Sequence, residues 1–545
     1  MIDWSSHLPI LPIVIPLLAG ASLLLLKDTH RWLRLGVSYV STLAQLVIAV
    51  DLLLITSGAQ ASSWPGRIPV YLLGNWPAPF AIVVVVDQLA AIMLTLNAVL
   101  GIAALLYASA RWDRAGVHFH PLFQFLLMGL NGAFLTGDLF NLFVFFEILL
   151  VASYGLMLHG SGELRVRSGL HYIATNLVAS FLLLIAIALI YGITGTLNMA
   201  DLATRAGSLA GPDRRLFEAT AAILGIAFLV KAAAWPLNFW LPNAYGHACA
   251  PVAASFAIMT KVGIYVLLRL GSLLLPTGAP AAFGGQWMFP LGLATLAFGT
   301  IGILATQQTE RMIGYCVIIS SGTLLTALGM PGVTLTGPAL FYLINSVLAL
   351  GAFYLLVELV ERTRSFGADV LAISLEAFDL DDPLSPDRSD DVVGVSLPAA
   401  MAFLGMAFIA CALLITGLPP LSGFVAKFSL LSAALQTSSI DTPSLGAWLL
   451  VGAVLVSGLA CIIALTRAGI RMFWSSEDSV VPRLQINEAA PVAFLILCCV
   501  GLTIWAGPIL NYLNNTALAL DNPQSYIEAV LHRQPALMTP TGARP

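Results

Sequence analysis

The chain has 545 residues, of which 59% are hydrophobic and only 10% are charged, and its mean hydropathy is +0.92. Soluble domains contain about 45–50% apolar and about 25% charged residues, so this composition excludes a protein made mainly of soluble domains. The net charge of −4 and an isoelectric point near 6.0 also argue against nucleic acid as a partner.

Apolar runs separated by charged or Gly/Pro-rich segments predict an all-α polytopic membrane protein with about fourteen transmembrane helices. The first run has no basic segment before it and no small-residue cleavage site after it. We therefore interpret it as a retained helix rather than a signal peptide. The predicted spans are 8–26, 35–56, 80–107, 121–136, 139–158, 170–193, 217–240, 249–274, 288–306, 312–329, 334–358, 398–435 (interrupted), 449–466 and 489–511.

Basic residues concentrate in the odd-numbered loops, which the positive-inside rule assigns to the cytoplasm. Both termini are therefore predicted to be periplasmic, and the chain to lie in a bacterial inner membrane with the lipid bilayer around it. The basic residues of the odd loops are Lys27, Arg31, Arg34, Arg111, Arg114, Arg165, Arg167, Arg311, Arg362, Arg364, Arg388, Arg467, Arg471 and Arg483.

Three segments are expected to lie outside the membrane. Residues 195–215 could form a short amphipathic helix on the outer surface. The acidic insertion 362–396, with the core DLDDPLSPDRSDD, has the composition of a disordered or docking segment. The polar tail beyond Asn514 is expected to make few contacts.

The six cysteines form no CxxC pair. They are most simply interpreted as small hydrophobic residues, so no metal site, haem or other cofactor is expected.

Lysines are the most informative residues of the sequence. There are only four, and all except Lys27 fall inside apolar runs. A charged side chain at the bilayer centre costs about 2.5–3.5 kcal/mol on insertion scales, so such positions usually serve a function. Lys231 is followed by Pro236, which should break or kink its helix. Lys261 should lie near mid-depth, with Arg269 snorkelling at the periplasmic end of the same helix.

Lys427 follows the pair Pro419 and Pro420, which should interrupt a second helix. A lysine beside a broken helix in each half of the chain suggests an internal repeat. A snorkelling lysine near a helix end is the structural alternative for each position.

Glu147 is the only acid in its apolar run. A buried carboxylate either becomes neutral or pairs with a cation, and Lys231 is its expected partner. Burial favours the neutral form of a lysine and a nearby carboxylate restores the charged form, so making and breaking the pair could load and release a proton. A purely structural ion pair is the alternative.

Other polar residues in or near the apolar runs are weaker candidates. His247 could be a proton relay or an ordinary interfacial histidine. Asp87 and Asp138 lie near predicted helix ends, where capping is a common role. Four further residues could support a water chain: His171, Tyr172, Ser320 and Ser321.

The run FLVKAAAWPLNFWLPNAYGHACAPVAASFAIMTKVGIYVLLR resembles the signature of the antiporter-like membrane subunits. These subunits occur in respiratory complex I, membrane-bound hydrogenases and Mrp-type (Pha/Mnh) cation/proton antiporters. The segment TGDLFNLFVFFEILLVASYGLML is most similar to the D-type subunits of the Mrp antiporters.

The resemblance implies two inverted five-helix repeats in which the seventh and twelfth helices are broken. It divides the chain into N-terminal helices (1–120), a first repeat (121–275), a second repeat with the acidic insertion (276–475), and a last helix with a polar tail (476–545). It also assigns ion translocation to Glu147, Lys231, Lys261 and Lys427, in the fifth, seventh, eighth and twelfth helices. The M subunit of complex I usually has Glu at the last of these positions.

The resemblance further implies a secondary transporter subunit rather than an enzyme, working in a hetero-oligomer with subunits A, B, C, E, F and G. Protons would drive the export of Na⁺ or another monovalent cation such as K⁺ or Li⁺. Two alternatives remain open: a proton-pumping N- or M-type subunit of complex I or a membrane-bound hydrogenase, and a structural scaffold subunit.

Overall fold

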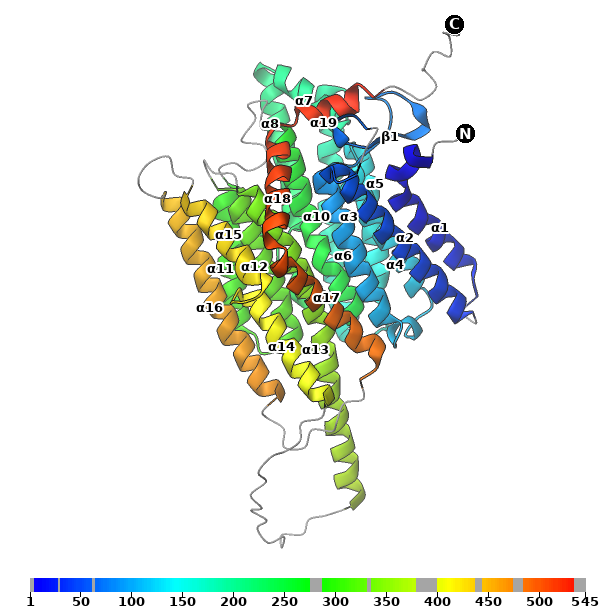
Figure 1. Cartoon of the computed structure of the whole chain (residues 1–545), viewed down its shortest axis with the longest axis vertical. Helices are drawn as coiled ribbons and strands as arrows, with labels where there is room; N and C mark the ends of the chain where they lie inside the picture. Colours follow the sequence, from blue (N-terminus) through cyan, green and yellow to red (C-terminus); the bar gives the residue numbers. More distant parts are fainter. Residues whose placement is uncertain are drawn as a thin grey trace.

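The computed structural model describes residues 4–27, 30–60, 64–274, 287–330, 335–378, 399–436, 444–473 and 484–533. Its long helices run side by side in one bundle, and shorter elements lie across one end (Figure 1). Twelve helices in this described part are long and apolar enough to cross a membrane. The multi-pass, predominantly helical architecture predicted from the sequence is therefore confirmed, whereas the count of fourteen spans stays a prediction.

The N-terminal part contains three long helices and a small hairpin. Strands β1 and β2 pair antiparallel, with Val70 opposite Val85. The hairpin explains why the third helix starts later than residue 80, since β-branched valines favour a strand here. The elements are η1 (Trp4–Ile10), α1 (Leu11–Leu25), α2 (Arg31–Ser57), η2 (Pro65–Arg67), β1 (Val70–Leu72), η3 (Leu73–Asn75), β2 (Val83–Val85), α3 (Gln88–Ala108) and η4 (Trp112–Arg114).

The next part contains the first broken helix. The short helix α7 buries Met199 and Leu202, which confirms the amphipathic helix expected within residues 195–215. The elements are α4 (Phe119–Leu135), α5 (Leu139–Met157), α6 (Glu163–Thr194), α7 (Met199–Ser208), α8 (Gly211–Lys231), α9 (Leu241–His247) and α10 (Ala250–Leu274).

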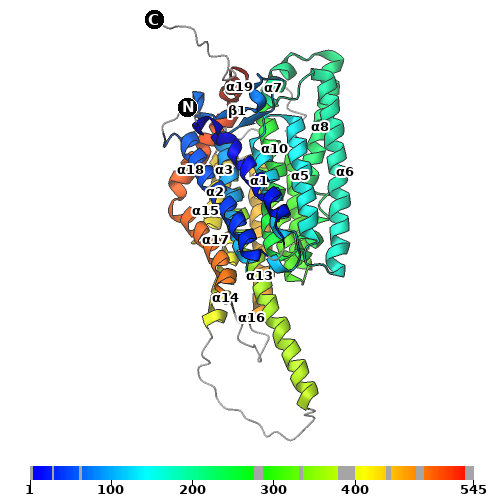
Figure 2. The ribbon, with the colours of Figure 1, turned by 90° about the vertical axis from the view of Figure 1, so that its right-hand side faces the viewer.

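The third part contains the second broken helix and the C-terminal elements. Helix α13 continues to Phe378 and projects beyond the bundle (Figure 2), so the beginning of the acidic insertion is helical. The rest of the insertion lies outside the described residues. The elements are α11 (Met288–Ala305), α12 (Thr309–Leu328), α13 (Thr336–Phe378), α14 (Ala399–Thr416), α15 (Ser422–Gln436), α16 (Leu445–Phe473), α17 (Ile486–Ile504), α18 (Ala506–Asp521) and α19 (Gln524–Leu531).

The expectation that the C-terminal tail contacts little is wrong for its first part. Helix α18 continues to Asp521, and α19 packs against α7 at one end of the bundle (Figure 1). Tyr526 and Val530 of α19 are buried, because apolar residues alternate with polar ones at helical spacing there.

The two helix breaks expected from the proline positions are confirmed. Helix α8 ends at Lys231, and Ala233 in the following turn has a positive φ of 55°. Helix α14 ends at Thr416, and Gly417 has a positive φ of 78°. Each break leaves backbone groups without helical partners, which is tolerated at membrane depth only where protein or water satisfies them.

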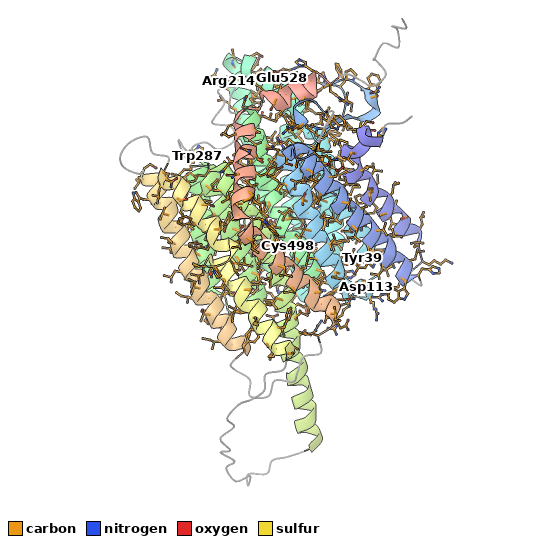
Figure 3. The ribbon with its side chains drawn as sticks, viewed as in Figure 1. Tyr39, Asp113, Arg214, Trp287, Cys498 and Glu528 are labelled. Atoms are coloured by element: carbon orange, nitrogen blue, oxygen red, sulfur yellow. The ribbon has the colours of Figure 1, made fainter. Side chains whose placement is uncertain are left out.

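The residues labelled in Figure 3 distinguish the two ends of the bundle. One end, here called the arginine-rich end, holds Asp113 (Figure 3), which is bound to Arg31 at 2.7 Å. Arg214 and Glu528 lie at the opposite end in the same view. Helix α13 projects from the arginine-rich end, where Arg34 donates to the carbonyl oxygen of Val117 and Arg165 lies over the ring of Trp112.

Candidate ion-translocation site

Lys231 is the last residue of α8, directly before the first break. Its side chain is 7% exposed, and its Nζ donates to Oδ1 of Asn176 on α6 at 3.0 Å. The ring of Phe146 on α5 lies 5.8 Å from the same nitrogen. A cation at a helix C-terminus also gains from the helix dipole, so the break itself stabilises the ammonium group.

The direct ion pair expected between Glu147 and Lys231 is not formed in the described part of the chain. Oε1 of Glu147 is buried and accepts no hydrogen bond. Glu147 is the residue next to Phe146, whose ring lies 5.8 Å from Nζ of Lys231, so the carboxylate is near the ammonium group without touching it. The direct partner of the Lys231 ammonium group is therefore the side-chain amide of Asn176, not the carboxylate of Glu147 as expected.

Lys261 lies at the centre of the bundle. Its side chain is 0% exposed, and its Nζ donates to Oγ of Ser321 on α12 at 3.3 Å. Gly263, two residues later, sits against the first break: a Cβ there would lie 2.7 Å from the carbonyl oxygen of Phe228. This glycine therefore lets α10 approach the end of α8 closely.

Lys427 belongs to the second half of a broken helix. Its Nζ donates to the carbonyl oxygen of Thr416, the last residue of α14, at 2.7 Å. A Cβ at Gly417 would lie 2.5 Å from Cδ of Lys427. Only glycine fits this position, because of both this contact and its left-handed backbone.

His247 lies beside a cavity of about 390 Å³ at the arginine-rich end. Its Nδ1 is 2.7 Å from Oγ of Ser168, and its carbonyl oxygen accepts from Nε of Arg165 at 2.7 Å. The cavity is also lined by Glu163, Glu310 and Glu358. Titratable groups around a cavity provide sites at which protons from bulk water can bind.

Glu358 is a candidate that the sequence analysis missed. One of its carboxylate oxygens accepts from Nε1 of Trp112 at 2.9 Å, and the other from the backbone N–H of Ala250 at 3.0 Å. Glu358 lies at the end of a long apolar run, where an acidic residue usually only marks the end of a membrane-spanning helix. Only the packing of α13 against η4 and α10 brings it to the cavity.

An aromatic cluster lies between this cavity and Lys231. Tyr245 lines the cavity, and its ring is 5.8 Å from that of Trp240. Trp240 is 5.4 Å from Tyr172, whose carbonyl oxygen accepts from Asn176. The cluster therefore connects the cavity to the amide that holds Lys231.

The two aspartates are helix caps. Asp87 accepts from the backbone N–H of Ala90, and Asp138 from that of Asn141. Asp87 also binds Arg269 through both carboxylate oxygens at 2.6 and 2.7 Å. Arg269 is buried, so its expected snorkelling is wrong: the guanidinium is satisfied inside the protein by Asp87.

The remaining candidates lie in different surroundings. His171 is exposed on α6, whereas Tyr172 is buried and its hydroxyl is 2.8 Å from Oγ of Ser153. Ser320 and Ser321 are both buried on α12. Pro236, Pro419 and Pro420 lie in the two breaks.

No three His, Cys, Asp or Glu side chains in the described residues come together as a metal site. The site instead consists of lysine ammonium groups held by an amide, a hydroxyl and a backbone carbonyl. Such groups can take up and release protons without a cofactor.

Known proteins share both the sequence and the architecture of this chain. Residues 136–455 match the family model described as NADH:quinone oxidoreductase/Mrp antiporter, TM. The D-type subunit of a probable K⁺/H⁺ antiporter from Rhizobium meliloti (strain 1021) is 51% identical over 97% of this chain and 98% of its own length. The D-type subunit of an Na⁺/H⁺ antiporter from Alkalihalophilus pseudofirmus (strain ATCC BAA-2126 / JCM 17055 / OF4) is 31% identical over 96% and 99%.

The architecture is similar to that of a chain in the Mrp complex from Dietzia sp. DQ12-45-1b. The TM-score is 0.80 at 26% identity, covering 97% of this chain and 100% of the other. The matches extend over both helix breaks and all four candidate charged positions. The chain therefore belongs to the NADH:quinone oxidoreductase/Mrp antiporter family of membrane subunits.

Proposed function

We propose that this chain is the D-type subunit of a multisubunit monovalent cation/proton antiporter, and that Glu147, Lys231, Lys261 and Lys427 carry its proton path. The observation that carries the proposal is the placement of the lysines. Three of the four in the sequence are buried in the bundle, two of them at helix breaks. The names of the near full-length relatives support a transporter subunit rather than an enzyme.

The proposed proton step at the first break uses the contacts of Lys231. When the ammonium is held by Asn176 and attracted by Glu147, the proton stays on the lysine. A movement that separates Lys231 from these groups leaves a desolvated cation, which then releases its proton. The proton leaves as H⁺ and the lysine remains as a neutral amine, so no electron transfer is involved.

Protons would reach this site from the arginine-rich end through the cavity that His247 and Glu358 line. The histidine and the carboxylate offer binding sites near bulk water. The Tyr245–Trp240–Tyr172 cluster limits free water flow between the cavity and Lys231. Protons would then pass from group to group rather than along a continuous water column, which would prevent a proton leak across the membrane.

We also propose fourteen membrane crossings arranged as two inverted five-helix repeats. Adding α4 and counting α8 with α9 as one crossing brings the twelve long spans to fourteen. Helix α4 starts beside Asp113 at the arginine-rich end, and α11 starts beside Trp287 toward the other end (Figure 3), which supports the inversion. The repeats would span 121–275 and 276–475, after N-terminal helices 1–120 and before 476–545.

The arginine-rich end would face the cytoplasm of a bacterial cell, with both termini periplasmic. The partners would be subunits A, B, C, E, F and G of the same antiporter. The transported cation would be Na⁺ or K⁺. The relative at 51% identity bears a K⁺/H⁺ name and the one at 31% an Na⁺/H⁺ name, so K⁺ should be tested first.

The test is cation-dependent proton movement in everted vesicles from an antiporter-deficient host that expresses the complete operon. A dye reports the proton gradient, and K⁺, Na⁺ and Li⁺ are added in turn. Vesicles with the operon lacking this chain are the control. Dissipation of the gradient by one cation, absent from the control, supports the proposal.

A redox-driven proton pump is the second candidate, because the family description includes NADH:quinone oxidoreductase. The same vesicles separate the two functions. Proton movement that follows the addition of an electron donor, and that no monovalent cation alters, would replace the antiporter proposal with this one.

A further inference from the structure

The cavity beside His247 at the arginine-rich end has more acidic than basic side chains around it. Its volume is about 390 Å³, and it is lined by three carboxylates and one guanidinium, those of Glu163, Glu310, Glu358 and Arg165. Within the part of the chain that the structure describes, none of the three acids forms a salt bridge. Carboxylates that share a cavity without basic partners attract a cation from solution.

The one guanidinium of the cavity is bound to other groups. Nε of Arg165 donates to the carbonyl oxygen of His247 at 2.7 Å. Its Nη1 donates to the carbonyl oxygens of His159 at 2.7 Å and Ser161 at 3.1 Å, and its Cζ lies 5.4 Å from the ring of Trp112. Backbone carbonyls and an aromatic ring therefore hold this cation, rather than the carboxylates of the cavity.

Glu358 is the most buried of the three acids. It is half-buried, whereas Glu163 and Glu310 are exposed. Nε1 of Trp112 donates to its two carboxylate oxygens at 2.9 and 3.0 Å, and the backbone N–H of Ala250 donates to one of them at 3.0 Å. These donors are neutral, so they orient the carboxylate without cancelling its charge. An ionised carboxylate has about four lone-pair sites, so it can still bind a cation.

The hydroxyl of Tyr354 is a second, independent sign of a ligand site. Tyr354 lines the cavity and is only 4% exposed, and its Oη has no hydrogen-bond partner among the described residues. Tyr354 precedes Glu358 by one turn of α13, so it shares the same face and lies about 6 Å nearer the bundle centre. Buried hydroxyls are normally hydrogen-bonded or bound to a ligand, so this one is suited to bind a ligand that enters past Glu358.

These groups suit a monovalent metal cation. Hard cations prefer carboxylate, hydroxyl and carbonyl oxygens as ligands. Since a water molecule occupies about 30 Å³ in the liquid, the cavity has room for an ion that keeps part of its hydration shell. One half-buried carboxylate matches a single positive charge. An organic cation would lack an aromatic face, because Arg165 already lies over the ring of Trp112.

The titratable and charged groups around Glu358 come from several packed elements. Arg362, one turn later on α13, is paired with Glu488 of α17 at 2.8 Å, so its charge is already matched. The other groups of the cavity and of the helices packed on α13 are Tyr107 of α3, Glu163 and Arg165 of α6, His247 of α9, Cys249 before α10, and Glu310 of α12.

We propose that the transported monovalent cation binds in this cavity between the carboxylate of Glu358 and the hydroxyl of Tyr354, in competition with a proton on Glu358. This inference rests on the proposed antiporter function and assigns its cation-binding site. When the cation binds, the O–H bond of the protonated carboxyl group breaks, its electron pair stays on the oxygen, and the proton leaves to water in the cavity. One positive charge replaces another, and nothing is oxidised or reduced.

The test measures the apparent KM of the complete antiporter for K⁺, and then for Na⁺, in everted vesicles. Tyr354→Phe removes only the hydroxyl, so it should raise the apparent KM by on the order of tenfold, a larger change than in the maximal rate. Tyr342→Phe is the matched control, because Tyr342 is 5% exposed on the same helix but does not line the cavity. Equal apparent KM values for the two variants would overturn the site.

Glu358→Gln separates cation binding from proton competition. In wild type the apparent KM should rise as the pH falls, because protons then occupy the carboxylate. Glutamine binds neither ion well, so the apparent KM should be high at every pH and lose this dependence. A lower maximal rate with an unchanged apparent KM and pH dependence would mean that Glu358 serves protons alone, which contradicts the proposal.

A double change at the two exposed acids keeps the test decisive if a buried variant fails to assemble. Glu163→Gln with Glu310→Gln should raise the apparent KM about threefold at low ionic strength and less when choline chloride screens the charges. Co-purification of the other subunits checks assembly. An apparent KM equal to that of wild type at both ionic strengths overturns the site, whereas absence of exchange in wild type removes the proposed function itself.

Discussion

The two helix breaks hold their lysines in similar ways but compensate the charge differently. Lys231 ends α8, and the ammonium group of Lys427 binds the carbonyl oxygen at the end of α14. Both cations therefore lie at the C-terminal end of a half-helix, where the helix dipole favours positive charge. At the first break an amide and a nearby carboxylate, Asn176 and Glu147, add to this effect.

At the second break, the ammonium group of Lys427 donates to the backbone carbonyl oxygen of Thr416 at 2.7 Å, and Gly458 of α16 lies against it. The first lysine is thus held by a side-chain amide with a carboxylate nearby, and the second by the backbone of the break itself. The two breaks therefore differ in the polar groups that hold the proton-carrying lysine.

The largest effect should come from Lys427→Arg and Lys427→Met. Arginine can still bind the Thr416 carbonyl, but it does not deprotonate in proteins. Both variants should lose proton exchange by on the order of 10²-fold or more in assembled complexes. If the Lys427→Arg complex exchanges protons at the wild-type rate in the vesicle assay, Lys427 has only a structural role and releases no proton.

Next, Glu147→Gln should slow exchange by about thirtyfold, because it removes the carboxylate that favours the charged form of Lys231. The loss of exchange should be greatest at alkaline pH, because there the lysine depends most on a nearby negative charge to stay protonated. Glu218→Gln is the control, since Glu218 forms a partly exposed i,i+4 pair with Arg214. Equal effects of the two changes would remove the distinction between the breaks.

A smaller loss, of about tenfold, should follow Asn176→Ala, because a hydrogen bond to a charged group contributes about 1.5–3 kcal/mol. Asn176→Asp should restore binding of the Lys231 ammonium and lower its release, so exchange stays slow while assembly is normal. Initial rates and apparent cation affinity would be measured in the same vesicles. A wild-type rate for Asn176→Ala would show that the observed hydrogen bond has no role in exchange.

The smallest expected effect is on stability. Gly417→Ala should destabilise the complex by about 1–2 kcal/mol or more, through its left-handed backbone and its contact with Lys427. The control is Gly405→Ala within α14, the helix that ends just before Gly417. A Cβ at Gly405 meets nothing within 4 Å, so this change should be neutral or slightly stabilising. Thermal unfolding of the detergent-solubilised complex compares the two, and equal midpoints would contradict the tight packing at this break.

Local sequence was enough to predict the lysines and the breaks. A lysine within an apolar run and a proline shortly before or after it are features of one segment, and their meaning does not depend on packing. This is why a break follows each of α8 and α14, as expected.

The partners of these lysines could not be predicted in the same way. Asn176 is 55 positions from Lys231, and Asp87 is 182 positions from Arg269. Which polar residue meets which cation depends on helix contacts and rotations that composition does not encode. Glu358 escaped notice for the same reason, because it lies at the end of its own apolar run and its partners come from distant parts of the chain.

The helix-breaking role of Pro236 also shows where local reasoning has a limit. The break was expected beside Lys231, but the sequence did not indicate that α8 would end at the lysine itself. The close approach of α10 at Gly263 and the left-handed turn at Ala233 fix that end, and both depend on tertiary packing.

The most direct measurement is cation-dependent proton exchange by the assembled complex carrying Lys231→Met, with Lys27→Met as the matched control. Lys27 is the one lysine of the sequence that lies outside the apolar runs, and it is exposed. If the buried lysines carry the proton, Lys231→Met abolishes exchange although all subunits co-purify, while Lys27→Met exchanges at the wild-type rate. Wild-type exchange by the assembled Lys231→Met complex would contradict the proposed path.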